Sequence, residues 1–438
     1  MQMQTEQGGI FSLFPFGVFL AFYLGLSLWS GDFYAVPMPI AFIAASAAAL
    51  AMGKGSLEEK IELYAKGMGE NNIMLMVLIF ILAGAFAAVA KSSGAVDSAV
   101  LISRHLIPDR FFAGGLFLVS CFISLAIGTS CGTIAALSPI AIGLAQSSGM
   151  GVPLMLGAVV GGAMFGDNLS MISDTTIAAT RTQETGMKEK FRVNIRIAIP
   201  AAVAVLLIYF FSARSGAAVP PPGALSWRDL LLVLPYGAIL VCALLGLNVM
   251  LLLLCGTVAA LIIGVCCGSF SPLAAVGVAG KGTLNMAETL IVALLAGGLL
   301  GTIRHNGGIT YLIGKIEKKI KSTGGCELGC AFLVTLVNLF TANNTVAIVV
   351  AGPVARELSL RYGCDNKRIA AILDTASCVA QGIIPYGAQI LIALGVAKSS
   401  GVVVPVNQLI GSLYYPMLLA AALLVFIFRG AYSRKKIQ

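Results

Sequence analysis

Long apolar segments separated by short polar ones make up most of this chain, and several of them are interrupted by polar residues. An apolar segment of about 20 residues is long enough to cross a bilayer as a helix. In the first half, the pattern predicts spans near 10–30, 35–53, 72–90 and 194–214, an apolar stretch 111–148 broken at 128–133, and a stretch 152–181 interrupted at 166–176.

The second half shows the same succession of segments. It predicts spans near 228–245, 248–268, 284–303 and 407–429, a broken stretch 327–356 and an interrupted stretch 368–397. Short motifs also recur at one nearly constant separation. Leu82-Ala83-Gly84 returns as Leu295-Ala296-Gly297, and Ser138-Pro139-Ile140-Ala141 returns as Gly352-Pro353-Val354-Ala355. We therefore expect two repeats, 1–214 and 227–438, joined by a linker 215–226.

The relative orientation of the repeats depends on the broken stretches. If 111–148 and 327–356 are re-entrant hairpins, each repeat crosses the membrane five times. An odd number of crossings inverts the second repeat, as in many secondary transporters. The fold expected is an all-α polytopic membrane protein with two inverted-topology repeats, about ten transmembrane helices, two re-entrant hairpins and interrupted helices at the midplane. Full crossings by the two broken stretches remain an alternative.

Composition supports a membrane protein. Of 438 residues, 58% are apolar and 11% are charged, whereas soluble proteins carry about 25% charged residues. The net charge of +9 is not a nucleic-acid footprint, because most Lys and Arg residues fall on one predicted side of the membrane. This bias predicts cytoplasmic N- and C-termini and counts Lys190 among the loop charges. The cysteines lie mostly in apolar segments, where they are expected to fill space.

The interruptions carry the candidate chemistry. An ionised Asp at bilayer depth costs about 2.5–3.5 kcal/mol, so such residues usually mark an ion or proton route. Asp167 and Asp174 are the leading candidates for holding Na+ or protons. The alternative for both is a capping role at a helix break or pairing with Arg181. The candidate ion- or proton-binding residues are Asp167, Asn168, Ser170, Ser173, Asp174, Thr175, Asn343, Asn344, Thr345 and Asp374, with Thr129, Ser130, Thr133 and Gln381 in support.

Some candidates have a structural alternative. Asn343-Asn344-Thr345 is also typical of a polar clamp between helices, and Asp374 of a helix cap. Glu288 is open between the two kinds of role, and His305 is expected at the interface. The only two His residues have basic neighbours, and no Ser-His-Asp set, metal motif or phosphate loop is present. We therefore expect no enzyme and no cofactor.

Two motifs resemble a known family. The run Gly166-Asp167-Asn168-Leu169-Ser170 through Ser173-Asp174-Thr175-Thr176 to Arg181 resembles the signature of the NhaC-type sodium/proton antiporter family, part of a wider ion-transporter group. Leu373-Asp374-Thr375, with the run from Gln381 to Gln389, resembles its second-repeat counterpart. The resemblance implies inverted repeats, re-entrant hairpins with polar tips, a bacterial inner-membrane location and a moving transport domain. Asn343-Asn344-Thr345 resembles such a tip, and Thr129-Ser130 is a looser match without Asn.

The function expected is export of cytoplasmic Na+ in exchange for external protons, which compete for the same carboxylates. The alternative is Na+- or H+-coupled transport of a small carboxylate such as malate or lactate. That alternative is disfavoured because no Arg or Lys is expected within the membrane to bind the carboxylate. A passive channel is a third possibility. The expected partners are the bilayer, Na+ and protons, without nucleic acid, and whether a homodimer forms is left open.

Overall fold

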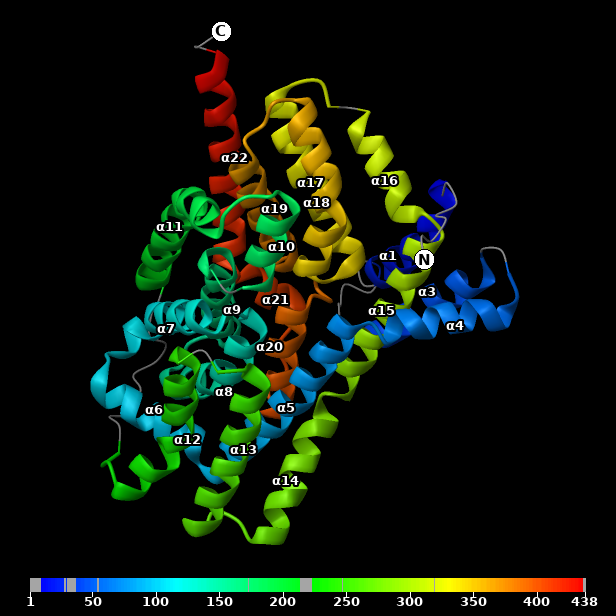
Figure 1. Cartoon of the computed structure of the whole chain (residues 1–438). Coiled ribbons are helices and arrows are strands. Elements are labelled where there is room, and N and C mark those ends of the chain that lie inside the picture. Colours follow the sequence, from blue (N-terminus) through cyan, green and yellow to red (C-terminus); the bar gives the residue numbers. More distant parts are fainter. Residues whose placement is uncertain are drawn as a thin grey trace.

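The computed structural model describes residues 9–26, 29, 37–52, 55–171, 173–212, 223–245, 247–318 and 320–435, and every regular element within them is a helix (Figure 1). The first half contains η1 (Ile10–Leu13), α1 (Phe14–Leu20), η2 (Ala21–Gly25), α3 (Met38–Ala51), α4 (Leu57–Met68), α5 (Asn71–Ser93), α6 (Ala95–Leu106), η3 (Asp109–Phe111), α7 (Phe112–Ile127), α8 (Ser130–Ser148), α9 (Val152–Leu169), α10 (Asp174–Thr182) and α11 (Met187–Ser212). The second half contains α12 (Trp227–Leu244), α13 (Val249–Cys266), α14 (Pro272–Asn285), α15 (Ala287–His305), α16 (Gly308–Glu317), α17 (Thr323–Thr341), α18 (Asn344–Arg361), α19 (Asn366–Gln381), α20 (Ala388–Ser399), α21 (Val406–Gly411) and α22 (Tyr414–Lys435).

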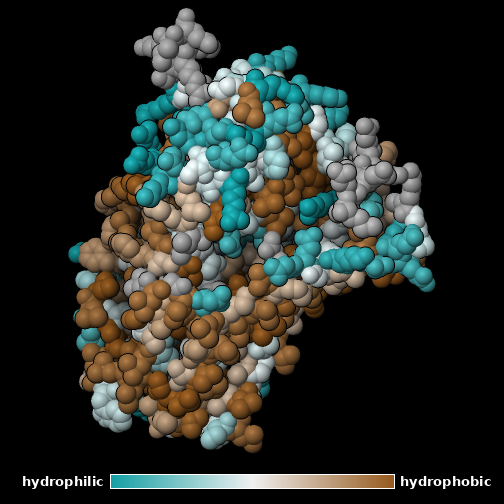
Figure 2. Space-filling view, in the orientation of Figure 1, coloured by the Kyte–Doolittle hydropathy of each residue, from teal (hydrophilic) through white to brown (hydrophobic). Residues whose placement is uncertain are grey.

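The all-helical architecture confirms the predicted class. Within the described residues, seven helices are long and apolar enough to cross a membrane by length and composition. In the orientation of Figure 2, apolar surface covers much of the lower part, while hydrophilic residues gather at the upper end and along α4. The surface is therefore that of a protein whose lower part, in this view, contacts lipid.

The same order of elements occurs in both halves. The hairpin α7–α8 has its counterpart in α17–α18, and the interrupted pair α9 and α10 in α19 and α20. Before the hairpins, the long helices α5 and α15 each lead into a short helix, α6 or α16. The predicted linker lies only partly within the described part of the chain, since 213–222 are outside it.

Glycines hold the halves against each other. Helix α4 packs on α15, and α5 packs on α14 (Figure 1). A Cβ added to Gly67 would lie 2.6 Å from the carbonyl oxygen of Gly297, and one on Gly84 would lie 2.5 Å from that of Gly282. Such approaches of one backbone to another need residues without a Cβ. We call the two contacts, Gly67 with Gly297 and Gly84 with Gly282, the glycine clasps.

The helix breaks are narrower than predicted. The first hairpin turns at 128–129 rather than over 128–133, and α9 continues to Leu169, so Gly166 to Asn168 are helical. Helix α19 runs without interruption to Gln381, so Asp374 is helical and the interruption of the predicted stretch 368–397 is confined to 382–387. The final span is divided into α21 and α22. These differences arise because the polar side chains in question find buried partners, described below, and the backbone does not have to unwind.

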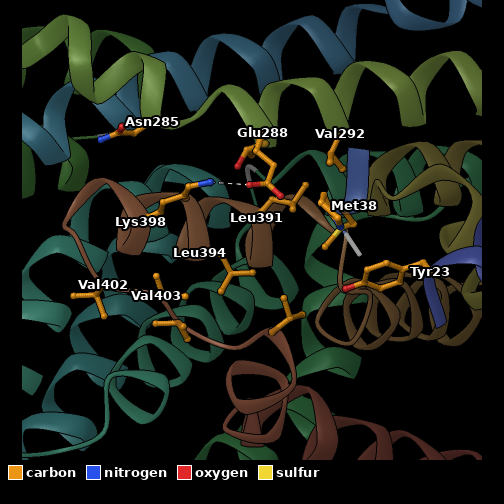
Figure 3. A pocket seen from close by; sticks show the side chains of 15 residues that line it. Tyr23, Met38, Asn285, Glu288, Val292, Leu391, Leu394, Lys398, Val402 and Val403 are labelled. Atoms are coloured by element: carbon orange, nitrogen blue, oxygen red, sulfur yellow. Dashed lines mark hydrogen bonds and ion pairs between the residues drawn. The ribbon is translucent and has the colours of Figure 1, made fainter. Parts of the chain in front are cut away.

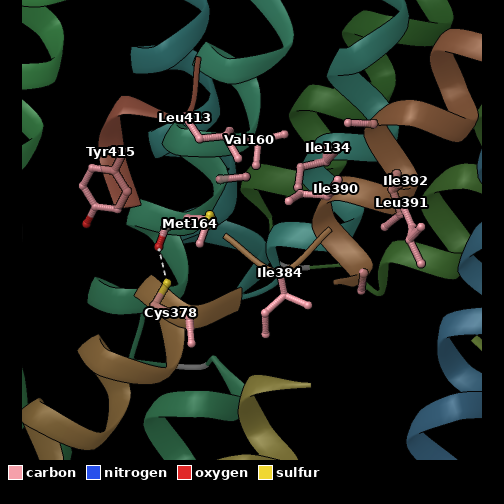
Figure 4. Close-up of a cluster of buried hydrophobic side chains, with 14 of the residues drawn as sticks. Ile134, Val160, Met164, Cys378, Ile384, Ile390, Leu391, Ile392, Leu413 and Tyr415 are labelled. Atoms are coloured by element: carbon pink, nitrogen blue, oxygen red, sulfur yellow. Dashed lines mark hydrogen bonds between the residues drawn. The ribbon is translucent and has the colours of Figure 1, made fainter. Parts of the chain in front are cut away.

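Helices of both halves contribute to one apolar core around the breaks. Figure 4 shows Ile134 of α8, Met164 of α9, Cys378 of α19 and Ile390 of α20 in one buried cluster. The thiol of Cys378 donates a hydrogen bond to the Met164 carbonyl oxygen, with 3.5 Å between Sγ and O. The core therefore crosses the boundary between the halves, and the breaks lie at its edge.

Candidate functional site

A cavity of about 430 Å³ lies where the breaks of both halves come together. The two hairpin turns, the end of α9 and the starts of α10 and α20 contribute its polar wall, and α5 and α13 contribute apolar side chains. The predicted site residues that line it are Thr129, Ser130, Asp167, Ser173, Asp174, Thr175, Asn343, Asn344 and Thr345. Segments far apart in the sequence therefore surround one space that is rich in oxygen atoms.

Asp167 lies in the last turn of α9 and is 5% exposed. Its Oδ1 accepts a hydrogen bond from the backbone N–H of Ser130, with 3.0 Å between the two atoms. Among the hydrogen bonds of the described residues, Thr129 makes none that caps α8 with its own side chain. The Asp167 carboxylate therefore takes the position of a helix cap, where the α8 dipole favours a negative charge.

Close packing of α7 on α9 brings Asp167 to this position. A Cβ on Gly166 would overlap the side chain of Ser124. The hydroxyls of Ser120 and Ser124 donate to the carbonyl oxygens of Val159 and Ala163 at 2.6 and 2.5 Å. Small residues and interhelical hydrogen bonds of this kind hold membrane helices together.

Asp174 is the first residue of α10, and its side chain is exposed to the cavity. Next to it, the hydroxyls of Ser173 and Thr175 share a hydrogen bond of 3.0 Å, and Thr175 Oγ1 also donates to the Asp167 carbonyl oxygen at 3.3 Å. Arg181 is exposed, and in the described part of the chain it forms an ion pair with neither aspartate. The predicted alternative of pairing with Arg181 is therefore wrong.

The second hairpin turn differs from the first. Asn343 Oδ1 accepts a hydrogen bond from the N–H of Val346 at 3.0 Å, so α18 is capped by its own residue. The side-chain oxygen of Asn344 accepts from the Thr345 N–H at 3.1 Å, while its buried Nδ2 has no hydrogen-bond partner within the described residues. Ala342 adopts a left-handed conformation with φ of 48°, unusual for a residue with a Cβ.

Gln389 lines the same cavity and was not among the predicted site residues. It is buried in the first turn of α20, and its Nε2 donates to Ser130 Oγ at 3.0 Å. Its Oε1 makes no hydrogen bond to any part of the protein that the structure describes. The sequence signal for Gln389 was weak: it is a single amide in an otherwise apolar stretch, just after the turn at 385–387.

A second polar cluster lies behind the cavity. Lys190 Nζ is 2.5 Å from Asp374 Oδ2, and both side chains are 1% exposed. Lys190 is therefore buried within the protein, so counting it among the exposed loop charges was wrong. Asp374 does not line the cavity, so its predicted contact with a transported ion is not part of this geometry.

The remaining predicted residues stabilise the breaks. Ser170 Oγ donates to the Leu125 carbonyl oxygen at 2.9 Å, and Thr133 Oγ1 to that of Thr129 at 3.1 Å. Gln381 Nε2 donates to the Ala342 carbonyl oxygen at 2.8 Å. Asn168 Nδ2 donates to the Tyr415 hydroxyl at 3.2 Å. These bonds satisfy backbone and side-chain groups that water cannot reach.

Glu288 belongs to a different cavity, of about 370 Å³ (Figure 3). There it pairs with Lys398 at 2.8 Å, and both side chains are about half exposed. Leu391, Leu394 and Lys398 of α20 line this space, on the face of the helix opposite Gln389. Glu288 therefore forms an ion pair outside the polar cavity.

The chemistry of the polar cavity suits a hard cation. Carboxylates, hydroxyls and side-chain amides offer oxygen ligands, which hard cations prefer. Within the described residues, no group of three or more His, Cys, Asp or Glu is arranged to hold a metal ion. A weakly held alkali ion fits two carboxylates and neutral oxygens better than a tightly bound transition metal does.

The chain is similar to known proteins over most of its length. The profile of the Na+/H+ antiporter family matches residues 13–213 and 229–429. The Na(+)/H(+) antiporter NhaC of Bacillus subtilis (strain 168) is 26% identical over 386 residues, covering 80% of this chain and 84% of the relative. The Malate-2H(+)/Na(+)-lactate antiporter of the same organism is 22% identical over 347 residues, covering 73% and 74%. The crystal structure of the Alcanivorax borkumensis YdaH transporter has a TM-score of 0.42 and 14% identity, over 81% of this chain and 85% of that one.

Proposed function

This chain belongs to the Na+/H+ antiporter family, and we propose that it exports cytoplasmic Na+ in exchange for protons. The observation that carries the proposal is that Asp167 and Asp174 line one cavity formed by the breaks of both halves. In this proposal the two carboxylates hold either the cation or protons. Thr129, Ser173, Thr175, Asn343 and Asn344 supply neutral oxygens or position the carboxylates.

Competition for the carboxylates couples the two fluxes. A buried carboxylate is costly in its ionised form unless a cation or a proton neutralises it. Binding of Na+ at Asp167 therefore releases the proton held there, and binding of a proton expels Na+. Because one site cannot hold both, movement of Na+ in one direction accompanies movement of protons in the other.

The proposal includes an orientation in the membrane. We place the chain in the bacterial inner membrane with both termini in the cytoplasm and with the two halves inverted relative to each other. The distribution of Lys and Arg supports the orientation, and the repeated order of helices supports the duplication. Inverted halves would let the cavity open alternately to the two sides.

Purified protein in liposomes with an imposed pH gradient tests the proposal. A pH-sensitive dye inside should report rapid collapse of the gradient on adding Na+, and much less in protein-free liposomes. The double variant Asp167→Asn/Asp174→Asn should lose this response, while Asp97→Asn, an exposed acidic residue of α6, should keep it. A gradient that is indifferent to Na+, or a double variant that equals the parent, would contradict the proposal.

The size of the cavity favours a second candidate, transport of a small carboxylate with Na+ or protons. About 430 Å³ exceeds the ~30 Å³ that one water molecule occupies in the liquid, so the space admits a small organic acid beside an ion. Against this candidate, Lys190 uses its hydrogen bonds on protein groups. If Na+ flux in the same liposomes requires added malate or lactate, the second candidate replaces the first.

A further inference from the structure

A buried lysine, Lys190, contacts the backbone of Asn168, the residue that follows Asp167. The ion exchange proposed above does not use this lysine. Lys190 Nζ donates to the Asn168 carbonyl oxygen at 2.9 Å and to Thr176 Oγ1 at 2.7 Å, in addition to its 2.5 Å contact with Asp374 Oδ2. These three partners account for the three N–H groups of an ammonium. Lys190 thereby joins α11 to α9, α10 and α19.

Asn194 repeats this bridge one turn later on α11. Its Nδ2 donates to the Asn168 carbonyl oxygen at 2.7 Å and to Asp374 Oδ2 at 2.9 Å. Its Oδ1 accepts from Thr375 Oγ1 at 2.9 Å. Residues four apart lie on the same face of a helix, so Lys190 and Asn194 form one unit, which we call the α11 bracket.

The bracket acts on the backbone next to Asp167. Helix α9 ends at Leu169, so its last carbonyl groups have no partner within the helix. The Asn168 carbonyl receives two donors from the bracket instead, one of them charged. A cation at this end also complements the negative end of the α9 dipole. The last turn of α9 is thereby fixed against α19 of the other half.

We propose that Lys190 is a positioning residue for the ion exchange: it holds the last turn of α9 so that Asp167 faces the cavity. The inference rests on the function proposed above. This role of Lys190 differs from that of a simple ion pair with Asp374. It depends on the hydrogen bonds to Asn168 and Thr176 and not only on charge balance.

Two variants separate these roles. Lys190→Met removes the charge and all three hydrogen bonds, and leaves Asp374 buried without its cation. Lys190→Met/Asp374→Asn restores charge balance but not the bonds to Asn168 and Thr176. Lys188→Met, an exposed lysine of the same helix, is the matched control. Each is measured in liposomes for the Na+ concentration at half-maximal rate and for the maximal rate, and in detergent for its thermal unfolding midpoint.

Both Lys190 variants should need about tenfold more Na+ or above for half-maximal rate, as expected for losing hydrogen bonds from a charged group. The maximal rate should change less, and the double variant should regain most of the unfolding midpoint. If Lys190→Met does not fold, the double variant alone carries the comparison. A double variant with the parent's Na+ dependence would overturn the inference. A parent protein without Na+-dependent exchange would overturn the proposed function instead.

Discussion

Asp167 and Asp374 are the same residue type, both are buried, and each lies on a helix that ends at a break. Their partners differ. Asp167 receives one backbone N–H and otherwise borders an open cavity. Asp374 accepts hydrogen bonds from a lysine and an asparagine and does not line that cavity. The first carboxylate is left with capacity for a ligand, whereas the second has its charge neutralised by the protein.

The difference shows that burial of a carboxylate in a membrane protein does not by itself indicate ion binding. A buried ammonium makes Asp374 part of a contact between helices, while Asp167 caps the N-terminus of α8 and, within the described residues, pairs with no cationic side chain. The two hairpin turns also differ. Asn343 caps the helix that follows it, α18, whereas the N-terminus of α8 is capped by Asp167, which lies on α9.

The largest effect is expected from Asp374→Asn. This variant leaves Lys190 charged and buried without its counter-ion, which costs about 3–5 kcal/mol of stability. The thermal unfolding midpoint in detergent should fall strongly, and adding Lys190→Met should bring most of it back. An unchanged unfolding midpoint for the single variant would mean that Asp374 is not the buried counter-ion of Lys190.

Asp167→Asn should lower exchange strongly with little loss of stability. An asparagine keeps the size of the side chain and can still accept from the Ser130 N–H, so mainly the charge is removed. Losing a charged ligand worth about 1.5–3 kcal/mol lowers Na+-dependent exchange by about 10- to 150-fold. Flux in liposomes measures the loss, with Asp97→Asn as control. Exchange at the parent's rate would remove Asp167 from the mechanism.

Asp174→Asn should have a smaller effect, because Asp174 is exposed in the cavity and water weakens its attraction for a cation. We expect a rise of about tenfold in the Na+ concentration needed for half-maximal rate, equal to about 1.4 kcal/mol. A loss as complete as that of Asp167→Asn would show that both carboxylates are required equally.

Gln389→Leu should give the smallest change. It removes a neutral oxygen from the cavity and the donor to Ser130 Oγ, and a neutral hydrogen bond contributes about 0.5–1.5 kcal/mol. The apparent Na+ affinity should fall about three- to fivefold. Gln389→Glu is the informative companion, because an added carboxylate should strengthen rather than weaken binding if Gln389 touches the ion.

The sequence predicted the helical class and most of the polar residues that line the cavity, for a physical reason. Polar groups in apolar segments must face one another or water, so Thr129, Ser130, Asp167 and Asn343 were identifiable without coordinates. The exact positions of the helix breaks were not identifiable, because whether a helix unwinds depends on hydrogen-bond partners in distant parts of the sequence. Asn338 of α17, for example, donates to the Ser377 carbonyl oxygen at 2.7 Å within an intact stretch of α19.

Lys190 was misplaced for the same reason. It belongs to a polar run that resembles a cytoplasmic loop, and only the start of α11 at Met187 and its packing against α19 turn that residue inward. Gln389 was missed because one amide in an apolar stretch carries little information until its neighbours are known. Pairings between distant segments are the information that a linear pattern lacks.

The glycine clasps have a consequence for how such a chain can be divided. Each half holds one partner of both contacts, Gly67 and Gly84 in the first half and Gly297 and Gly282 in the second, so neither half can assemble this scaffold alone. If the two halves are expressed as separate polypeptides, each half should therefore be recovered only when the other is co-expressed.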